Sequence, residues 1–449
     1  MRNCLHSCGR LLFFPVSLAL FFAPDSASAA RVPPSIHATV VGTSQAAPSL
    51  TAARIARLPA SQRAVWTAYL DHSHLQEARD RATLIGERKG LANIPPVPQE
   101  GFGGIRSMPL DRDPAWYATP EARHVGDVIA SFQTPGGGWS KNFGMAGAVR
   151  LPGQSYAPNN ISAHLGPDDF DTPRDPNWNY VSTLDNDSTT TEIRFLTLLA
   201  TANPGHLGMP YRAACLRGIH YLLDAQFRNG GWPQVWPLEG IYHDAITFND
   251  NAVTLAATVL TDAASGAGNY AFVPAELRRQ ATAASARALE CILATQVVVN
   301  GRRTVWAQQH DALTLAPVSG RNYEPAALSS GESADVLLYL MSLPNPSPPV
   351  QASIKAGVEW LKSAAISGQA WTGTRAEGRH LVPTPGAPPI WARYYSLTTD
   401  KPIFGDRDKT IHDDVSELSL ERRNGYAWYS SGPQRALDEC TKWSATHAQ

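Results

Sequence analysis

The feature that most constrains the fold of this chain is a short phrase that occurs three times, each time after a helical pattern. In each copy a glutamine near the end of an apolar, helically spaced stretch precedes a turn and a tryptophan, over residues 133–139, 226–232 and 296–306. Two of the turns contain consecutive glycines, which end helices because glycine adopts a left-handed backbone readily. A unit repeated in this way predicts stacked copies of one helical element.

The spacing of apolar residues predicts that the helices pair into hairpins. The predicted pairs are 119–133 with 189–203, 210–227 with 251–264 and 274–297 with 330–343, and a further helix follows at 348–366. Valine-rich alternating runs, which predict strands, are missing between them. We therefore expect an all-α fold in which helical hairpins close into an (α/α) toroid.

The connections between these helices differ in length. Those at 134–188, 228–250 and 298–329 are long, whereas the connections that alternate with them are short. Successive connections in antiparallel hairpins alternate between two ends, so the three long ones are expected at one end of the toroid. Long loops on a rigid scaffold commonly carry function, and we predict that this end is the active face.

The first 29 residues have the layout of a secretory signal peptide, with Arg2 and Arg10, an apolar run and small residues before the cleavage point. The run is too short to span a bilayer, so we expect a secreted protein, extracellular or periplasmic, without a membrane anchor. Residues 30–110 are expected to form a partly flexible extension with a helix at 61–89, and residues 111–449 the catalytic toroid. We expect a monomer.

Composition and missing motifs exclude several classes of function. The formal net charge of −1 argues against a nucleic-acid partner, because such proteins usually carry a basic face. The sequence contains neither HExxH nor GxSxG nor a phosphate-binding glycine loop, so zinc peptidases, serine hydrolases and kinases are not indicated.

Two clusters of acidic and amide residues, 185–187 and 249–251, stand at the ends of long loops where helices are predicted to begin. Helix capping explains one such residue at each helix start, yet each cluster offers at least two. Calcium binds carboxylate, amide and water oxygens in flexible geometry. If both clusters lie on one face, they favour a Ca²⁺ site with Asp185, Asp187 and Asp250 as candidate ligands.

Basic residues accompany these clusters. Arg321 lies in the third long loop, Arg393 and Arg407 lie in the C-terminal part, and Lys141 follows the first tryptophan phrase. A salt bridge with a neighbouring acid is the ordinary explanation for any one arginine, and a solvated turn is the ordinary explanation for the lysine. Gathered on one face, they suit an anionic ligand, because arginine binds carboxylates through two hydrogen bonds.

Seven longer stretches carry a family resemblance, and they lie between about residues 112 and 438. They are WYATPEARHVGDVIASFQTPGGGWSKN from Trp116, LDNDSTTTEIRFL from Leu184, FRNGGWPQVWP from Phe227, FNDNAVT from Phe248, WAQQHDALTLAP from Trp306, RNYEPAALSSGES from Arg321 and IFGDRDKTIHDDVSELSLERRNGYAWY from Ile403. Together they resemble polysaccharide lyase family 10, the pectate lyases built on an α/α toroid.

This resemblance implies calcium-dependent β-elimination of de-esterified homogalacturonan (polygalacturonate) to 4,5-unsaturated oligogalacturonides. It implies that Arg321 is the catalytic base and that Asp187 and Asp250 organise calcium and substrate. It also implies that Arg393 and Arg407 contact substrate carboxylates. A protonated arginine is a poor base, so a cation, other guanidinium groups and burial are expected to favour loss of its proton, with an alkaline pH optimum.

Two other functions remain compatible with the residues themselves. One is an inverting glycoside hydrolase on an α/α toroid, in which Asp185 or Asp187 and Asp250 act as the acid and base pair. The other is a non-catalytic protein that binds glycans in the same cleft. Loss of cleavage with retained binding on replacing Arg321 would favour the lyase.

Overall fold

Seven helices of the computed structural model correspond to the repeated helical pattern, and the model describes residues 39–101, 108–145 and 147–447. The predicted signal peptide, 1–29, lies outside the described residues. The helices are α3 (Pro120–Ser131), α4 (Thr190–Ala202), α5 (Met209–Ala225), α6 (Ala252–Ser265), α7 (Ala275–Thr295), α8 (Ser330–Ser342) and α9 (Pro348–Ala364).

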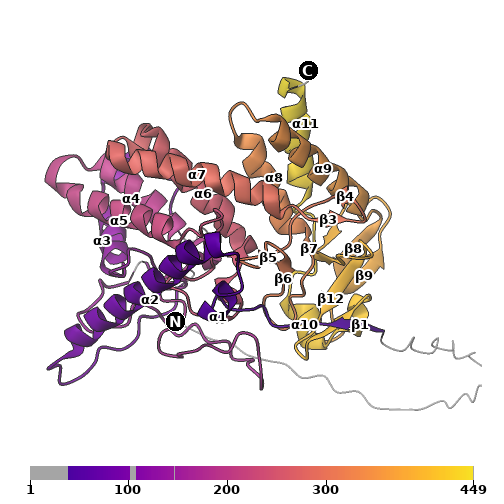
Figure 1. The fold of residues 1–449 in the computed structure, drawn as a ribbon, viewed down its shortest axis with the longest axis horizontal. Helices are drawn as coiled ribbons and strands as arrows, with labels where there is room; N and C mark the ends of the chain where they lie inside the picture. Colours follow the sequence, from indigo (N-terminus) through magenta and orange to yellow (C-terminus); the bar gives the residue numbers. More distant parts are fainter. Residues whose placement is uncertain (1–38, 102–107, 146, 448–449) are drawn as a thin grey trace, which may run out of the picture. The chain divides into compact units, whose positions relative to one another are not determined.

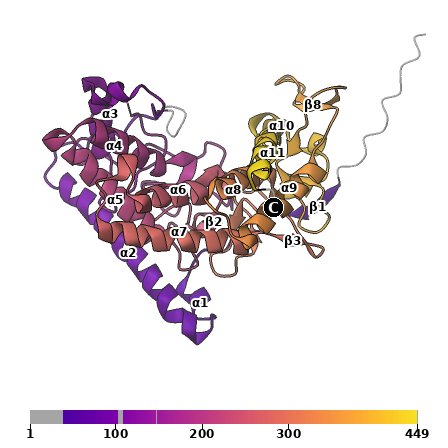
Figure 2. The same cartoon turned by 90° about the horizontal axis from the view of Figure 1, so that it is seen from above.

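The most extensive helix packing joins α4 to α5 and α6 to α7, across the short connections (Figures 1 and 2). α3 also packs on α4, α5 packs on α6, and α8 packs on α9. A short connection makes consecutive helices antiparallel neighbours, so each pair buries the apolar stripes that the sequence shows. Within the described residues, no helix combines the length and the apolar character that a membrane span requires.

The expectation of an all-α fold is wrong, because strands form several small sheets. The largest is five-stranded, in the order β1-β13-β12-β11-β7, and its neighbouring strands are antiparallel. Its strands are β1 (Val40–Thr43), β7 (Leu328–Ser329), β11 (Tyr394–Tyr395), β12 (Pro402–Gly405) and β13 (Thr410–His412). Strands of two to four residues are too short to show alternation, and the pairings of β1 with β13 and of β7 with β11 join distant parts of the chain.

The remaining strands form one three-stranded sheet and three pairs. The three-stranded sheet contains β2 (Ile246–Thr247), β5 (Gln309–His310) and β6 (Pro317–Val318), and the pairs are β3 (Val298–Val299) with β4 (Arg302–Arg303), β8 (Gln369–Thr372) with β9 (His380–Pro383), and β10 (Trp391–Ala392) with β14 (Tyr429–Ser430). The chain ends with α10 (Leu420–Gly425) and α11 (Gln434–His447), and α11 packs on α8 and α9.

The N-terminal extension is tied to the helical part in the described residues. After β1 and α1 (Ala52–Ile55), helix α2 (Ala60–Arg88) forms where a helix was expected at 61–89. The Tyr69 hydroxyl of α2 donates to the Ala225 carbonyl at 2.9 Å, and the Tyr69 ring packs on Phe227. Arg54 forms an ion pair with Asp311 at 2.6 Å. Residues from Thr39 onward belong to one compact unit.

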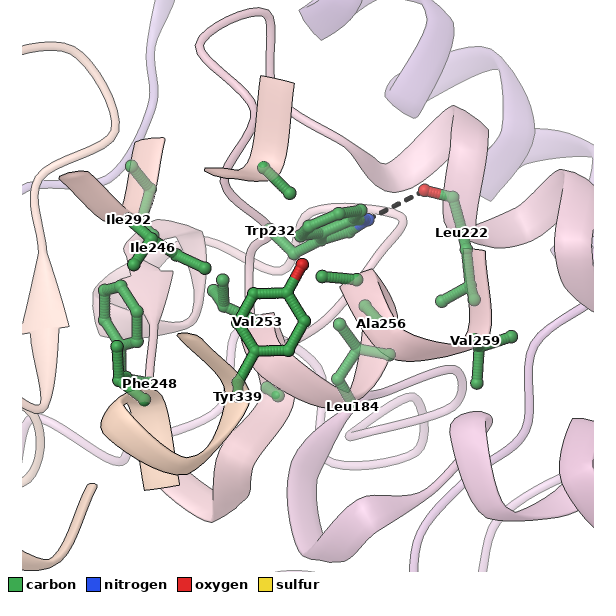
Figure 3. Packing of buried hydrophobic residues seen from close by; sticks show 14 of the residues in the cluster. Leu184, Leu222, Trp232, Ile246, Phe248, Val253, Ala256, Val259, Ile292 and Tyr339 are labelled. Atoms are coloured by element: carbon green, nitrogen blue, oxygen red, sulfur yellow. Dashed lines mark hydrogen bonds between the residues drawn. The ribbon is translucent and has the colours of Figure 1, made fainter. Parts of the chain in front are cut away.

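The hydrophobic core runs between the paired helices and the turns that follow them. Figure 3 shows its central part, where Trp232 packs among Leu184, Val253 and Ala256. The same view shows the Trp232 indole donating a hydrogen bond to the Leu222 carbonyl. The repeated tryptophan is thus a core residue that also binds the end of the preceding helix.

The tryptophans that follow α3, α5, α7 and α9 share this anchoring geometry, one more than the sequence pattern indicated. Each is fully buried, and each indole N–H donates to a carbonyl near the end of the preceding helix at 2.7 or 2.8 Å. The pairs are Trp139 with Ile129, Trp232 with Leu222, Trp306 with Ile292 and Trp391 with Leu361. The fourth copy follows α9, where neither the glutamine nor the glycine turn marks it.

These anchors lead to a stability prediction. Trp306→Phe removes the short indole hydrogen bond to the Ile292 carbonyl, which keeps the longer one from the Thr295 hydroxyl at 3.2 Å, and it removes part of a fully buried side chain. We expect a loss of about 2–4 kcal/mol in the free energy of unfolding, measured by chemical denaturation. Trp116→Phe is the matched control, because its indole bonds at 3.4 Å to an exposed site on Glu121 and should cost less than about 1 kcal/mol. Equal losses in both variants would contradict the anchoring role.

Candidate active site

The residue two positions after each anchoring tryptophan lines a single cavity. These four residues are Lys141, Gln234, Gln308 and Arg393. Each tryptophan fixes its turn against the preceding helix in the same way. The side chains two positions later, which come from four parts of the chain, therefore meet at one place. Lys141 and Arg393 were predicted as site residues, whereas the two glutamines were missed. The recurring spacing from the tryptophan is the signal that marks them.

The cavity has a volume of about 230 Å³ and is lined by polar side chains. Its other lining residues are Tyr180, Asp185, Asn186, Tyr242, Asn249, Asp250, Gln309, Arg321, Glu324 and Tyr426. They come from all three long connections and from the C-terminal part. A cavity lined by carboxylates, amides, phenols and cations suits a charged, hydroxyl-rich ligand better than an apolar one.

Asp185 and Asp250 form an acid pair in front of α4 and α6. They belong to two single-turn 3₁₀ helices, Asp185–Asp187 and Asn249–Asn251. Neither α4 nor α6 has a side-chain N-cap hydrogen bond, so helix capping does not account for the clusters. Burial, together with the charge of Asp185, raises the pKa of Asp250 well above its usual range. Asp250 therefore keeps its proton to higher pH than Asp185, and the two carboxylates repel each other once both are ionised.

Left-handed backbone conformations explain why amide and acidic residues stand at these turns. Asn186 has φ 52°, Asp250 has φ 49° and Asn251 has φ 60°. Asn and Asp tolerate this region better than other residues with a side chain. The Asp250 carboxylate also accepts a hydrogen bond from the Asn186 backbone N–H at 3.3 Å, which links the two turns.

Lys141 and Gln234 hold the first carboxylate of the pair. Lys141 forms an ion pair with Asp185, and the Gln234 side-chain amide donates to the other Asp185 oxygen at 2.6 Å. Burial alone would raise the pKa of Asp185, but the Lys141 charge, the hydrogen bonds with Asp250 and Lys141 and the Arg321 charge together outweigh it, and the pKa lies below its usual range. Asp185 is therefore ionised, and Lys141 is a partly buried site residue and not a solvated turn residue.

Arg321 lines the cavity as an ion pair with Glu324. Its Nη2 lies 2.6 Å from Glu324 Oε1, and its backbone N–H donates to Glu324 Oε2 at 2.9 Å. Burial alone would lower the pKa of Arg321, but the Glu324 carboxylate outweighs burial and the pKa lies well above its usual range. The expected tendency of the surroundings to remove the proton is therefore not what this structure shows.

Arg393 occupies another part of the same cavity. Its Nη2 lies 2.6 Å from Glu332 Oε1 and 3.3 Å from the Asn249 side-chain oxygen. Its guanidinium also lies 4.8 Å from the centroid of the Tyr426 ring. These contacts hold the guanidinium at the cavity, where it remains charged and can bind an anionic group.

Two predicted residues are not among those that line the cavity. Asp187 follows Asn186 in the same turn, and its charge acts on the neighbouring Glu192 and Asp335. Arg407 forms an ion pair with Glu421 at 2.8 Å and lies beside the Tyr323 ring. Their predicted roles in binding metal and substrate stay predictions.

Tyr180 and Tyr242 are cavity residues that the sequence did not indicate. Their hydroxyls lie 3.1 Å apart, Tyr180 also contacts His243 Nε2 at 2.8 Å, and Tyr242 donates to Asp171 at 2.6 Å. Burial first, and the nearby Asp171 charge second, raise the pKa of Tyr180 well above its usual range. The cavity therefore presents neutral phenols next to its charged groups.

The acid pair fits a calcium ion that takes further oxygens from ligand and water. The described residues contain no group of three or more His, Cys, Asp and Glu arranged to hold a metal. Two carboxylates and the amide side chains of Asn186 and Asn249 are nevertheless the kinds of donor that Ca²⁺ accepts. The raised pKa of Asp250 reflects a repulsion that a divalent cation would relieve.

Comparison with known proteins shows the family of this chain. Residues 133–437 match the family model described as pectic acid lyase. The structure resembles a mutant family 10 polysaccharide lyase from Cellvibrio cellulosa in complex with trigalacturonic acid, with a TM-score of 0.62 and 30% identity over 74% of this chain and 98% of that one. No curated protein matches significantly.

A second solved structure, described as a family 10 polysaccharide lyase from Cellvibrio cellulosa, matches with a TM-score of 0.62 and 28% identity. The match extends over 77% of this chain and 99% of that chain. The protein is thus an enzyme of the lyase class, which acts on polysaccharides. It belongs to the pectic acid lyase family, as a polysaccharide lyase of family 10, and this confirms the predicted resemblance.

Proposed function

We propose that this pectate lyase cleaves de-esterified homogalacturonan by calcium-assisted β-elimination, with Arg321 as the base. The observation that carries the proposal is that Arg321, Arg393 and the Asp185–Asp250 pair line one small polar cavity. Anion-binding and cation-binding groups side by side suit a polyuronate, which carries a carboxylate on every sugar. The complex of a relative with trigalacturonic acid supports the same substrate class.

In the proposed reaction Arg321 removes the proton on C5 of a galacturonate unit, next to its carboxylate. The electron pair of the C5–H bond forms the C4–C5 double bond, and the C4–O bond breaks. The departing oxygen takes a proton from water. Arg321 has to be neutral when it accepts the C5 proton, so activity should rise with pH.

Cations stabilise the charge that develops on the uronate carboxylate during this step. Arg393 binds that carboxylate, and Lys141 and Arg407 are proposed as further contacts. Asp185 and Asp250 would hold Ca²⁺, with Asp187 as a predicted third ligand. When bound, Ca²⁺ neutralises the uronate carboxylate and acidifies the neighbouring C5 proton.

The acid pair argues against an inverting glycoside hydrolase. Such an enzyme keeps its two carboxylates about 6.5–9.5 Å apart, with room for a water between them. Here Asp185 and Asp250 are close enough for Asp185 to raise the pKa of Asp250, and Asp185 forms an ion pair with Lys141. We also propose export through the N-terminal signal peptide, with the enzyme acting outside the cytoplasm as a monomer on polymer or oligomers.

The proposed function predicts an ultraviolet signal. The mature protein, incubated with polygalacturonate at alkaline pH and Ca²⁺, should give rising absorbance from the 4,5-unsaturated product, and a chelator should lower the rate by at least about 10-fold. Restoring Ca²⁺ should restore the rate. Flat absorbance with new reducing ends would mean hydrolysis. Flat absorbance without reducing ends, but with oligogalacturonate bound, would mean a binding protein.

A further inference from the structure

Glu324 holds Arg321 from two sides with one carboxylate. One oxygen accepts from the guanidinium at 2.6 Å and the other from the Arg321 backbone N–H at 2.9 Å. The Tyr426 hydroxyl donates to the same carboxylate at 2.7 Å. The Glu324 side chain is 3% exposed and the Arg321 side chain is 36% exposed. The acid is therefore enclosed behind the arginine, and the arginine presents its free edge to the cavity.

The Glu324 carboxylate is the strongest of the charges around Arg321. Burial alone would raise the pKa of Glu324, but Arg321 lowers it to about 2, so the carboxylate is ionised throughout the working pH range. The other titratable or charged groups that face Arg321 come from the remaining elements of the site, and they are Tyr180, Asp185, Tyr242, Tyr323, Arg393, Arg422 and Tyr426. The phenols are neutral, the two arginines favour loss of the proton, and the ionised Asp185 opposes it in the same sense as Glu324.

We infer that Glu324 is a positioning residue that sets both the orientation and the protonation of Arg321. The inference rests on the proposed function, in which Arg321 is the base. Its ion pair fixes the guanidinium toward the cavity and, by the same charge, opposes loss of the proton that the reaction requires. A contact that only held the guanidinium in place would orient it without changing its protonation.

These two effects act in opposite directions on rate. Neutralising Glu324 without changing its size makes a larger fraction of Arg321 neutral at a given pH, and it also makes Arg321 a weaker base. An opposite charge in direct contact shifts a pKa by about 1–3 units. If half of that shift is lost in base strength, kcat/KM at pH 7–8 should rise by about 3- to 30-fold, and the advantage should vanish toward high pH.

The test compares pH profiles of kcat/KM on polygalacturonate for the wild type, Glu324→Gln and Glu332→Gln, with Ca²⁺ in excess. Glu332→Gln removes the same charge from an equally short ion pair, that of Arg393. We expect the rising limb to move to lower pH in Glu324→Gln alone. A uniform loss at every pH, or an equal displacement in both variants, overturns the inference. If Glu324→Gln does not fold, Glu324→Asp takes its place. This variant keeps the charge, so the rising part of its kcat/KM profile should lie at the wild-type pH while kcat is lower. A profile displaced along the pH axis would overturn the inference.

A second measurement does not depend on activity. The ¹³Cζ resonance of Arg321, assigned by its loss in Arg321→Lys, is titrated in the wild type and in Glu324→Gln. We expect its titration to begin at lower pH in the variant, and an unchanged titration overturns the inference. A shifted resonance with an unshifted rate profile supports the control of Arg321 by Glu324 and overturns Arg321 as the base.

Discussion

Arg321→Ala is expected to reduce the formation of unsaturated product by about 10²- to 10⁴-fold, the range for loss of a general base. Binding of trigalacturonate should change by less than about 10-fold, because Arg393 and the remaining cavity residues still face the ligand. Product is measured by ultraviolet absorbance with saturating substrate and Ca²⁺, and binding by calorimetry at low pH, where turnover is slow.

The control for this variant is Arg279→Ala, which removes an equal charge from an exposed ion pair with Glu276 at the start of helix α7. It should retain the wild-type rate. Arg321→Lys should recover little activity, because lysine does not reproduce the planar contact with Glu324. Unchanged cleavage by Arg321→Ala would remove Arg321 from the proposed role, whatever the Glu324 experiments show.

Asp250→Asn is expected to raise the Ca²⁺ concentration needed for half-maximal activity by about 100-fold or more. The acid pair loses one of its two charges, while the asparagine keeps one oxygen and nearly the same shape. Without Ca²⁺ and at alkaline pH, where both carboxylates of the wild type are ionised, the variant should melt at a higher temperature than the wild type, because the repulsion between Asp185 and Asp250 is gone. Activity against Ca²⁺ concentration and thermal melting with and without Ca²⁺ measure both effects.

Asp262→Asn is the matched control, because it removes an equal charge on helix α6, which directly follows Asp250, and Asp262 does not line the cavity. Its calcium dependence and its melting should follow the wild type. If Asp250→Asn keeps the wild-type calcium response, the ion does not bind at the acid pair. Asp187→Asn then becomes the decisive variant, since Asp187 is the remaining predicted ligand.

Much of the candidate site could be predicted, because its charged residues occur in short sequence motifs. Asp185, Asp250 and Lys141 stand next to helix starts or tryptophan turns, Arg321 begins one of the stretches that carry the family resemblance, and Arg393 lies between two of them. All five line the cavity. Asp187 and Arg407 come from equally clear phrases and do not line it. Side-chain direction within a turn is set by φ and ψ, which spacing alone does not reveal.

The missing parts of the prediction have identifiable physical causes. Tyr180 carries no local signal, since its importance comes from its contact with Lys141. Glu324 stands three residues after Arg321, but its burial and its hydrogen bond from Tyr426 are not visible in the sequence. The sheets were missed because their strands are too short for periodicity, and β1 pairs with β13 across most of the chain. Which segments of the chain form strands is therefore visible only in the tertiary structure.

The sequence by itself determined the helices, the repeated tryptophan turns, the acid and arginine phrases and the family. These depend on residues close together in the chain, where spacing reports the interaction directly. Only the tertiary structure decided which side chains share one cavity, that Trp391 completes the set of anchors and that Glu324 keeps Arg321 protonated. The cavity and the Trp391 anchor join residues far apart in the chain, and such contacts leave no period in the sequence. Glu324 stands only three residues after Arg321, but its effect depends on burial, which spacing does not report.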